Sequence, residues 1–253
     1  MQDYKKYIKD EEILKKLELL HLKKEQLKML LDSNNNVGPY IVELAGLPRT
    51  GKSVTTERLA DFFCKGGIDV AKTKEPAQII KDGISKDELD KMTCVKFNDL
   101  TLEIAKKELN DLNLQKKQLI IQDRGVIDNY FWYQMMYEEK AITDEQYERY
   151  LLNFASDLLN INKVYVLIAD PGVIVLRDYL QSIYLEDRKK TNIERIGMLK
   201  NSLDHLIEKV PFLYKNNVRV FDTTHISEID VAITLASDIT DNMIRRLNNK
   251  KGK

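Results

Sequence analysis

The segment Gly46–Ser53, GLPRTGKS, has the composition and spacing of a loop that binds phosphate. It matches the pattern G-x-x-x-x-G-K-[ST], in which the glycines let backbone N–H groups turn toward a phosphate group. In this pattern Lys52 reaches the outer phosphates of a nucleoside triphosphate, and the Ser53 hydroxyl binds Mg²⁺. We therefore expect the nucleotide to lie against Gly46, Leu47, Pro48, Arg49, Thr50, Gly51, Lys52, Ser53 and Val54.

Charged side chains also follow three other segments that have the composition of strands. They are Glu75 after residues 68–72, Asp123 and Arg124 after residues 118–122, and Arg177 after residues 163–169. In an open parallel sheet, ligands bind beyond the carboxyl ends of the strands. We therefore expect these side chains to share one rim of the sheet with Ser53, where they would surround a phosphate group.

Strands and helices alternate along most of the chain. Apolar runs predict strands at 40–45, 68–72, 118–122, 163–169 and 218–221. Helical spacing predicts helices at 54–63, two or three within 78–113, others from about 127 to 160, and further ones at 172–180, 192–209 and 227–247. This alternation favours right-handed βαβ units and a parallel sheet covered on both faces. The chain is therefore expected to have an α/β fold.

The first 33 residues predict an amphipathic helix that precedes this fold. Its apolar stripe consists of Ile13, Leu17, Leu20, Leu27 and Leu31, with Lys24 in the remaining position of the seam. We expect the stripe to dock on its own chain with the long Lys24 stem at an edge, while a dimer seam or a partner-binding helix is the alternative. The expected division is 1–36 for the helix and linker, 37–247 for the α/β domain, and 248–253 for a basic tail.

Taken together, the loop and the strand ends resemble the thymidylate kinase and deoxynucleoside kinase superfamily of P-loop phosphotransferases. The resemblance runs from about Tyr40 to Ile244 and rests on KEP at 74–76, DR at 123–124, D-P-x-x-x-x-x-R at 170–177 and the segment VRVFDTTHISEIDVAITLA. It implies a three-layer P-loop kinase fold with a five-stranded parallel sheet, preceded by the N-terminal helical extension. It also implies transfer of the γ-phosphoryl group of ATP, with Mg²⁺, to a nucleoside or nucleoside monophosphate.

The requirements of phosphoryl transfer then suggest a role for each charged residue. Asp123 would hold Mg²⁺ together with Ser53, Glu75 would orient an acceptor hydroxyl or a Mg²⁺-bound water, and Arg124 would face the acceptor. Arg49 would clamp a phosphate group from within the loop. The predicted catalytic set is Lys52, Glu75, Asp123, Arg124, Arg49, and two arginines of a stretch that would close as a lid, Arg177 and Arg188. Ordinary surface charge is the alternative for Arg49, Arg177 and Arg188.

Departures from the family patterns leave the acceptor open. Thymidylate kinases have an arginine in the helix before the third strand, whereas the segment from Phe97, FNDLTLEIAKKEL, has none. Deoxynucleoside kinases have a glutamine there to read the base, for which Asn98 is a shorter candidate, and Gly125 replaces an aromatic residue. The aromatic run at 130–133 favours core packing over stacking in an acceptor pocket. A kinase for a non-nucleotide alcohol and a non-catalytic ATP-binding regulatory module both stay open.

Composition limits the remaining classes of function. Among 253 residues, 40 are Lys or Arg and 40 are Asp or Glu, so no net charge attracts nucleic acid. No apolar run is long enough to cross a membrane, and no apolar leader begins the sequence. Two cysteines exclude a disulfide framework. We expect a cytoplasmic protein that binds ATP and a small acceptor, without nucleic-acid or membrane partners. A monomer and a homodimer both stay open.

Overall fold

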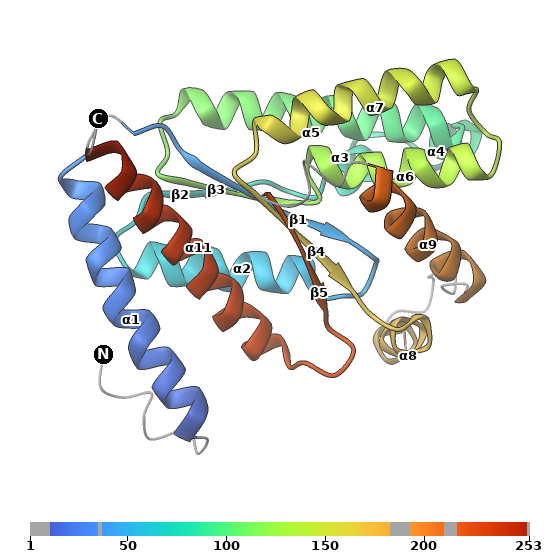
Figure 1. The fold of residues 1–253 in the computed structure, drawn as a ribbon. Coiled ribbons are helices and arrows are strands. Elements are labelled where there is room, and N and C mark those ends of the chain that lie inside the picture. Colours follow the sequence, from blue (N-terminus) through green and yellow to red (C-terminus); the bar gives the residue numbers. More distant parts are fainter. Residues whose placement is uncertain (1–10, 35–36, 183–192, 210–216, 252–253) are drawn as a thin grey trace.

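A computed structural model describes residues 11–34, 37–182, 193–209 and 217–251 of the chain (Figure 1). The strands are β1 (Tyr40–Gly46), β2 (Val70–Lys72), β3 (Leu119–Asp123), β4 (Lys163–Ile168) and β5 (Val218–Asp222). The helices are α1 (Glu11–Asp32), α2 (Lys52–Lys65), α3 (Pro76–Gly83), α4 (Lys86–Lys91), α5 (Cys94–Leu114), α6 (Val126–Glu138), α7 (Asp144–Leu159), α8 (Pro171–Ser182), α9 (Ile193–Lys209) and α11 (Glu228–Lys251).

The five strands form one parallel sheet in the order β2-β3-β1-β4-β5. Strand β1 is central, and all seven of its residues are buried. In the register of the sheet, Leu44 lies opposite Asp123 of β3 and Tyr165 of β4. The carboxyl end of β1 is therefore flanked by the carboxyl end of β3, as the expected rim requires. The predicted α/β class and five-stranded parallel sheet are confirmed.

Helices cover both faces of the sheet and make three layers (Figure 1). Alternate residues of β1 point to opposite faces, as strand geometry requires. Ile41 and Ala45 join a core with α5, α6, α7 and α9, whereas Val42 and Leu44 join a second core with α1, α2 and α11. Strand β1 thus supports two cores. None of the helices in the described ranges has both the length and the apolar character needed to cross a membrane.

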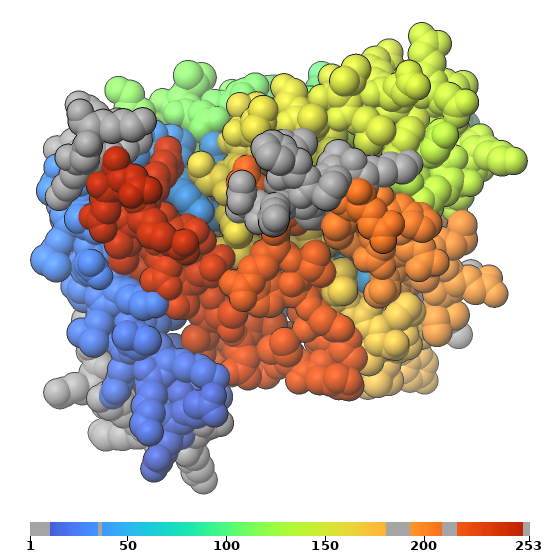
Figure 2. All heavy atoms as spheres, viewed as in Figure 1, coloured from blue at the N-terminus to red at the C-terminus, as the bar shows by residue number. Residues whose placement is uncertain are grey.

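Helix α1 packs along α11 as an addition to the second helical layer (Figure 2). Leu20, Leu27 and Leu31 of its predicted stripe are buried in the same core as Met243 and Leu247 of α11. The stripe is thus covered by its own chain, as expected. The proposed division of the chain into residues 1–36, 37–247 and 248–253 stays a prediction.

The expected edge position of Lys24 is wrong. Its side chain is buried, with 4% of the residue exposed, and its ammonium lies 4.3 Å from the centre of the Phe62 ring. Burial lowers the pKa of Lys24. Gly66 makes room for the stem, because a Cβ there would lie 2.5 Å from Lys24 Cδ. A cation–π contact, rather than solvent, thus accommodates the charge.

Several element ends differ from the expected ones. Strand β2 begins at Val70 rather than at residue 68, because the Ile68 N–H donates to Phe63 O in the turn that ends α2. The last helix continues to Lys251, beyond the expected end at residue 247. Residues 78–113 contain parts of three helices, of which α4 begins with a capping box between Ser85 and Glu88.

Candidate active site

The phosphate-binding loop joins β1 to α2 through two glycines in conformations that other residues rarely adopt. Gly46 has a φ of 114°, and a Cβ there would lie 2.3 Å from Leu167 O of β4. Gly51 has a φ of 89° and directly precedes α2. The Leu47 N–H donates to Leu167 O at 3.0 Å. Glycine at position 46 therefore lets the loop pass directly against β4.

The other loop residues divide between packing and exposure. Leu47 is fully buried in a core with Met135 and Ile174, and this anchors the loop to α6 and α8. Thr50 is buried, and its hydroxyl donates to Leu47 O at 2.8 Å. Pro48 is half-buried and Val54 is exposed. The loop is thus held in shape by its own side chains.

Lys52 lies across the inner side of the loop. It is buried, and its ammonium donates hydrogen bonds to Gly46 O at 3.1 Å and to Leu47 O. Burial, followed by the charge of Arg124, lowers the pKa of Lys52 to about 7. A phosphate group bound beside Lys52 would offset both effects and favour the charged ammonium.

Ser53 and Asp123 lie together where β3 ends. Burial raises the pKa of the Asp123 carboxyl group, and the Ser53 side chain acts in the opposite direction. Asp123 Oδ1 is buried and has no hydrogen-bond partner. An unpartnered carboxylate oxygen beside a hydroxyl fits Mg²⁺, which takes oxygen ligands and is often bound through one or two protein groups plus substrate phosphates. No cluster of three or more His, Cys, Asp or Glu suited to a metal occurs in the described part of the chain.

Arg124 connects the loop to the second and third strand ends. Its side chain donates to Gly46 O at 3.2 Å and pairs with Asp128 Oδ2 at 3.0 Å and with Glu75 Oε1 at 3.1 Å. The Gly46 N–H donates to Asp128 Oδ1 at 2.7 Å. Asp128 and Arg124 thus hold the first residue of the loop from both its N–H and its C=O. Sequence analysis placed Glu75 and Arg124 at this rim but did not identify Asp128.

Glu43, also missed, supports this arrangement from inside the sheet. It is fully buried on β1, and its carboxylate accepts hydrogen bonds from the N–H groups of Ile127, at 2.9 Å, and Asp128, at 2.7 Å. Burial raises the pKa of Glu43 to about 8. Glu43 thereby satisfies the free N–H groups at the start of α6 and fixes the helix that carries Asp128. The available signal was a carboxylate inside an otherwise apolar strand, YIVELAG.

The two arginines proposed to act on phosphate hold the loop to other elements. Arg49 Nε pairs with Asp178 Oδ1 of α8 at 2.6 Å. Arg177 donates to Arg49 O at 3.3 Å and to Thr223 O, after β5, at 2.7 Å. Their roles in binding phosphate stay predictions. Arg188 lies outside the described residues.

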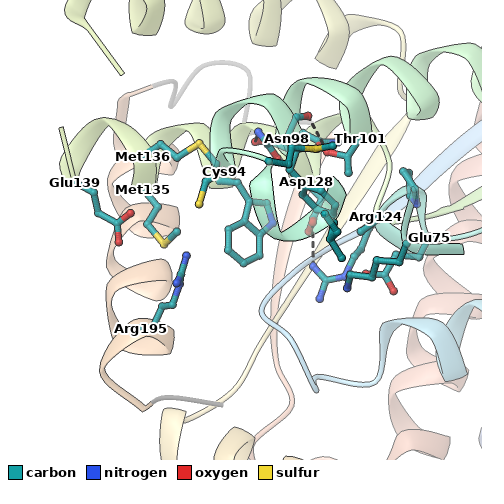
Figure 3. A pocket seen from close by; sticks show the side chains of 18 of the residues that line it. Glu75, Cys94, Asn98, Thr101, Arg124, Asp128, Met135, Met136, Glu139 and Arg195 are labelled. Atoms are coloured by element: carbon teal, nitrogen blue, oxygen red, sulfur yellow. Dashed lines mark hydrogen bonds and ion pairs between the residues drawn. The ribbon is translucent and has the colours of Figure 1, made fainter. Parts of the chain in front are cut away.

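A cavity of about 620 Å³ opens beside the loop and extends between α3, α4, α5, α6 and α9 (Figure 3). Glu75, Arg124 and Asp128 line one end of it. Its volume falls in the range of about 300–1,000 Å³ that is usual for small-molecule sites. The rim that holds the loop therefore also borders a second compartment, large enough for an acceptor.

One wall of the cavity comes from α5 and α6. Asn98 is buried, and its Nδ2 donates to Asn129 O at 3.1 Å, while the Thr101 hydroxyl donates to Asn129 Oδ1 at 2.5 Å. The aromatic run of α6 divides, because three of its members are buried in the core as expected, whereas Trp132 is half-buried and lines the cavity. Trp132 packs against two of the cores as well, so the expected core packing holds for it too, but it also borders the cavity.

Comparisons with known proteins agree with this fold. The profile of a family described as "AAA domain" matches residues 42–192, more than half of the chain. Among solved structures, the chain is similar to a deoxyadenosine kinase from M. mycoides with bound dATP, with a TM-score of 0.53 and 18% sequence identity. The match covers 79% of this chain and 99% of the other. At this identity the likeness shows the fold. No curated protein matches the sequence.

Proposed function

The chain belongs to the AAA-domain family of P-loop nucleotide-binding proteins, and from this premise we propose that it transfers the γ-phosphoryl group of ATP to a small acceptor. Lys52 and the backbone N–H groups of the loop would hold the phosphates of ATP. Ser53 and Asp123 would hold Mg²⁺, which offsets negative charge on the phosphate oxygens when bound.

The contacts of Arg124 carry this proposal. Its guanidinium reaches Gly46 O of the loop and Glu75 of the cavity, at 3.2 Å and 3.1 Å. One side chain therefore spans the space between the compartment for the donor phosphate and the compartment for the acceptor. An acceptor hydroxyl that donates to Glu75 would be oriented toward the loop, and Arg124 would stabilise charge that develops during transfer.

The charges around the cavity favour a neutral nucleoside over a nucleoside monophosphate. The basic residues that line the cavity are Lys81, Arg124 and Arg195, and the acidic residues are Glu75, Asp90, Asp128 and Glu139. Arg124 is already paired with two carboxylates. A monophosphate would bring further negative charge to a cavity with more acidic than basic residues. The name of the M. mycoides kinase, which shares the fold, supports a nucleoside acceptor.

A coupled assay of ADP release across a panel of nucleosides and nucleoside monophosphates tests the proposal. We expect at least one nucleoside to stimulate turnover in the presence of Mg²⁺, and the corresponding monophosphate to stimulate it much less. Stimulation by monophosphates alone would contradict the assignment of the acceptor. Lys52→Ala serves as the control for contaminating kinases.

A further inference from the structure

Two opposite charges lie at the end of the cavity away from the phosphate-binding loop. Arg195 of α9 and Glu139, just after α6, line the cavity near Met135 (Figure 3). Glu75, Arg124 and Asp128 lie at the other end in the same view. Neither the Arg195 nor the Glu139 side chain makes a hydrogen bond or an ion pair within the described ranges, although both are exposed to the cavity.

These two charges are placed where they do not stabilise their own helices. Arg195 lies in the first turn of α9, where the helix dipole disfavours a cation. Glu139 follows the last turn of α6, where the dipole disfavours an anion. Local helix stability therefore does not account for either residue, and a ligand in the cavity would give both a partner.

The backbone that carries both residues is held in place. Glu138, beside Glu139, accepts hydrogen bonds from the Ser202 hydroxyl and from His205 Nδ1 of α9, the latter at 2.7 Å. Leu203 and Leu206 of α9 are buried in the core that contains α6. The last turn of α6 is thus fixed to the second half of α9, while the Glu139 and Arg195 side chains are left available at the cavity. This arrangement suits a recognition site.

On the premise of the proposed function, we infer that Glu139 and Arg195 read the base of the acceptor nucleoside and select bases with an exocyclic amino group. A carboxylate can only accept hydrogen bonds and a guanidinium can only donate them. Glu139 would accept from the amino group, and Arg195 would donate to a neighbouring ring nitrogen or carbonyl oxygen of the same base. Trp132 and Met136 line the cavity too, and they provide apolar surface for the faces of the base.

Pairs of nucleosides that differ only in this group provide the test. The two pairs are cytidine with uridine and adenosine with inosine, each compared in the deoxy series as well. For the wild-type protein, kcat/KM is expected to be higher for the amino member of whichever pair is phosphorylated. Glu139→Gln should lower this amino-to-oxo ratio about tenfold, because the amide also offers a donor that suits the oxo member.

Arg195→Gln should raise KM for both members about tenfold and leave kcat nearly unchanged, because its guanidinium is expected to contact only the base. Glu148→Gln, on the exposed side of α7, is the matched control and should leave the ratio unchanged. If the wild-type protein phosphorylates nucleosides but Glu139→Gln keeps the same ratio, the inference is overturned while the proposed function stands. If no nucleoside is phosphorylated, the proposed function itself fails and the inference fails with it.

Discussion

Lys52 and Asp123 illustrate how burial prepares individual residues for a charged ligand. Burial lowers the pKa of Lys52 to about 7 and raises the pKa of Asp123, so desolvation disfavours the charged form of each. A phosphate group beside Lys52 and a divalent cation beside Asp123 would each favour that charged form. The electrostatic interaction of both residues with MgATP would therefore be stronger than that of an exposed pair.

Replacing Lys52 tests the assignment of the donor site. Among the described cations, only Lys52 bonds to the carbonyl groups of both Gly46 and Leu47 in the loop. Lys52→Ala should abolish ATP turnover, because it removes the ammonium group that would bind the phosphates. It should not unfold the protein, since the buried ammonium is costly in the absence of an anion. Steady-state kinetics and circular dichroism measure the two effects, and normal turnover in a folded variant would refute the assignment.

Replacing Glu75 separates the acceptor site from the donor site. Glu75→Gln keeps the size of the side chain but removes the charge that pairs with Arg124 at 3.1 Å. We expect acceptor-dependent turnover to fall about 100-fold, as for the loss of a group that orients a reacting hydroxyl. The Kd for MgATP, measured by calorimetry, should change less than twofold. An equal loss of ATP affinity would place Glu75 on the donor side.

The buried carboxyl group of Glu43 should make stability depend on pH. Its folded-state pKa is about 8, above the ordinary value of 4.5. The stability that it contributes is therefore fully present below about pH 4.5 and is lost as pH rises toward 8. The side chain of Glu43→Gln does not titrate, so the variant should not lose this stability. From pH 5 to pH 8, its free energy of unfolding should therefore rise relative to that of the wild type by on the order of a few kcal/mol.

Urea unfolding of both proteins at several pH values measures this difference. Glu148→Gln, whose side chain is exposed, provides a control for the loss of one negative charge. A constant difference between the wild type and Glu43→Gln over this pH range would show that the carboxyl group is not protonated preferentially in the folded state.

The sequence predicted where the site residues lie better than it predicted the contacts between them. The loop pattern and the strand ends predicted which residues meet at the rim, because parallel strands end on the same side. Asp128 escaped notice because its role depends on the angle at which α6 starts after Gly125. Glu43 sets that start through bonds to Ile127 and Asp128. Such contacts join segments that are distant in the sequence, so no local sequence pattern predicts them.

At the scale of elements, periodicity identified strands and helices but not their order in the sheet. Alternating strands and helices imply a parallel sheet in general, whereas the order β2-β3-β1-β4-β5 depends on pairing between strands that are distant in the sequence. The short β2 was overestimated, because Ile68 is buried like a strand residue but belongs to the turn after α2. Hydrophobicity reports burial, and burial does not distinguish a strand from a turn.

Removing the N-terminal helix tests its role at this scale. Deleting residues 1–33 should lower the Tm by roughly 5–10 °C, because it uncovers the apolar surface of α11 that Leu20, Leu27 and Leu31 bury. Helix α1 packs on α11, away from the loop between β1 and α2 (Figure 1), so the loop should still bind MgATP. Light scattering should give the mass of a monomer for both proteins. A full-length dimer that becomes a well-folded monomer on truncation would contradict docking within one chain.

At the scale of the whole molecule, the fold brings the donor and acceptor compartments to one rim of the sheet. The loop after β1 meets Arg124 after β3, and Arg124 reaches Glu75 after β2. Helix α9, from a later part of the chain, closes the cavity opposite this rim with Arg195. Neither compartment is formed by one continuous segment. The proposed phosphoryl transfer would therefore require the α/β core as a whole.

Transfer of a labelled phosphoryl group tests the central claim most directly. The protein is incubated with Mg²⁺, ATP labelled at the γ-phosphate, and each nucleoside, and the products are separated. We predict that the label appears in a nucleoside monophosphate in an amount equal to the ADP formed, and that Lys52→Ala or chelation of Mg²⁺ prevents it. Release of the label only as inorganic phosphate, at a rate that no nucleoside changes, would contradict the claim.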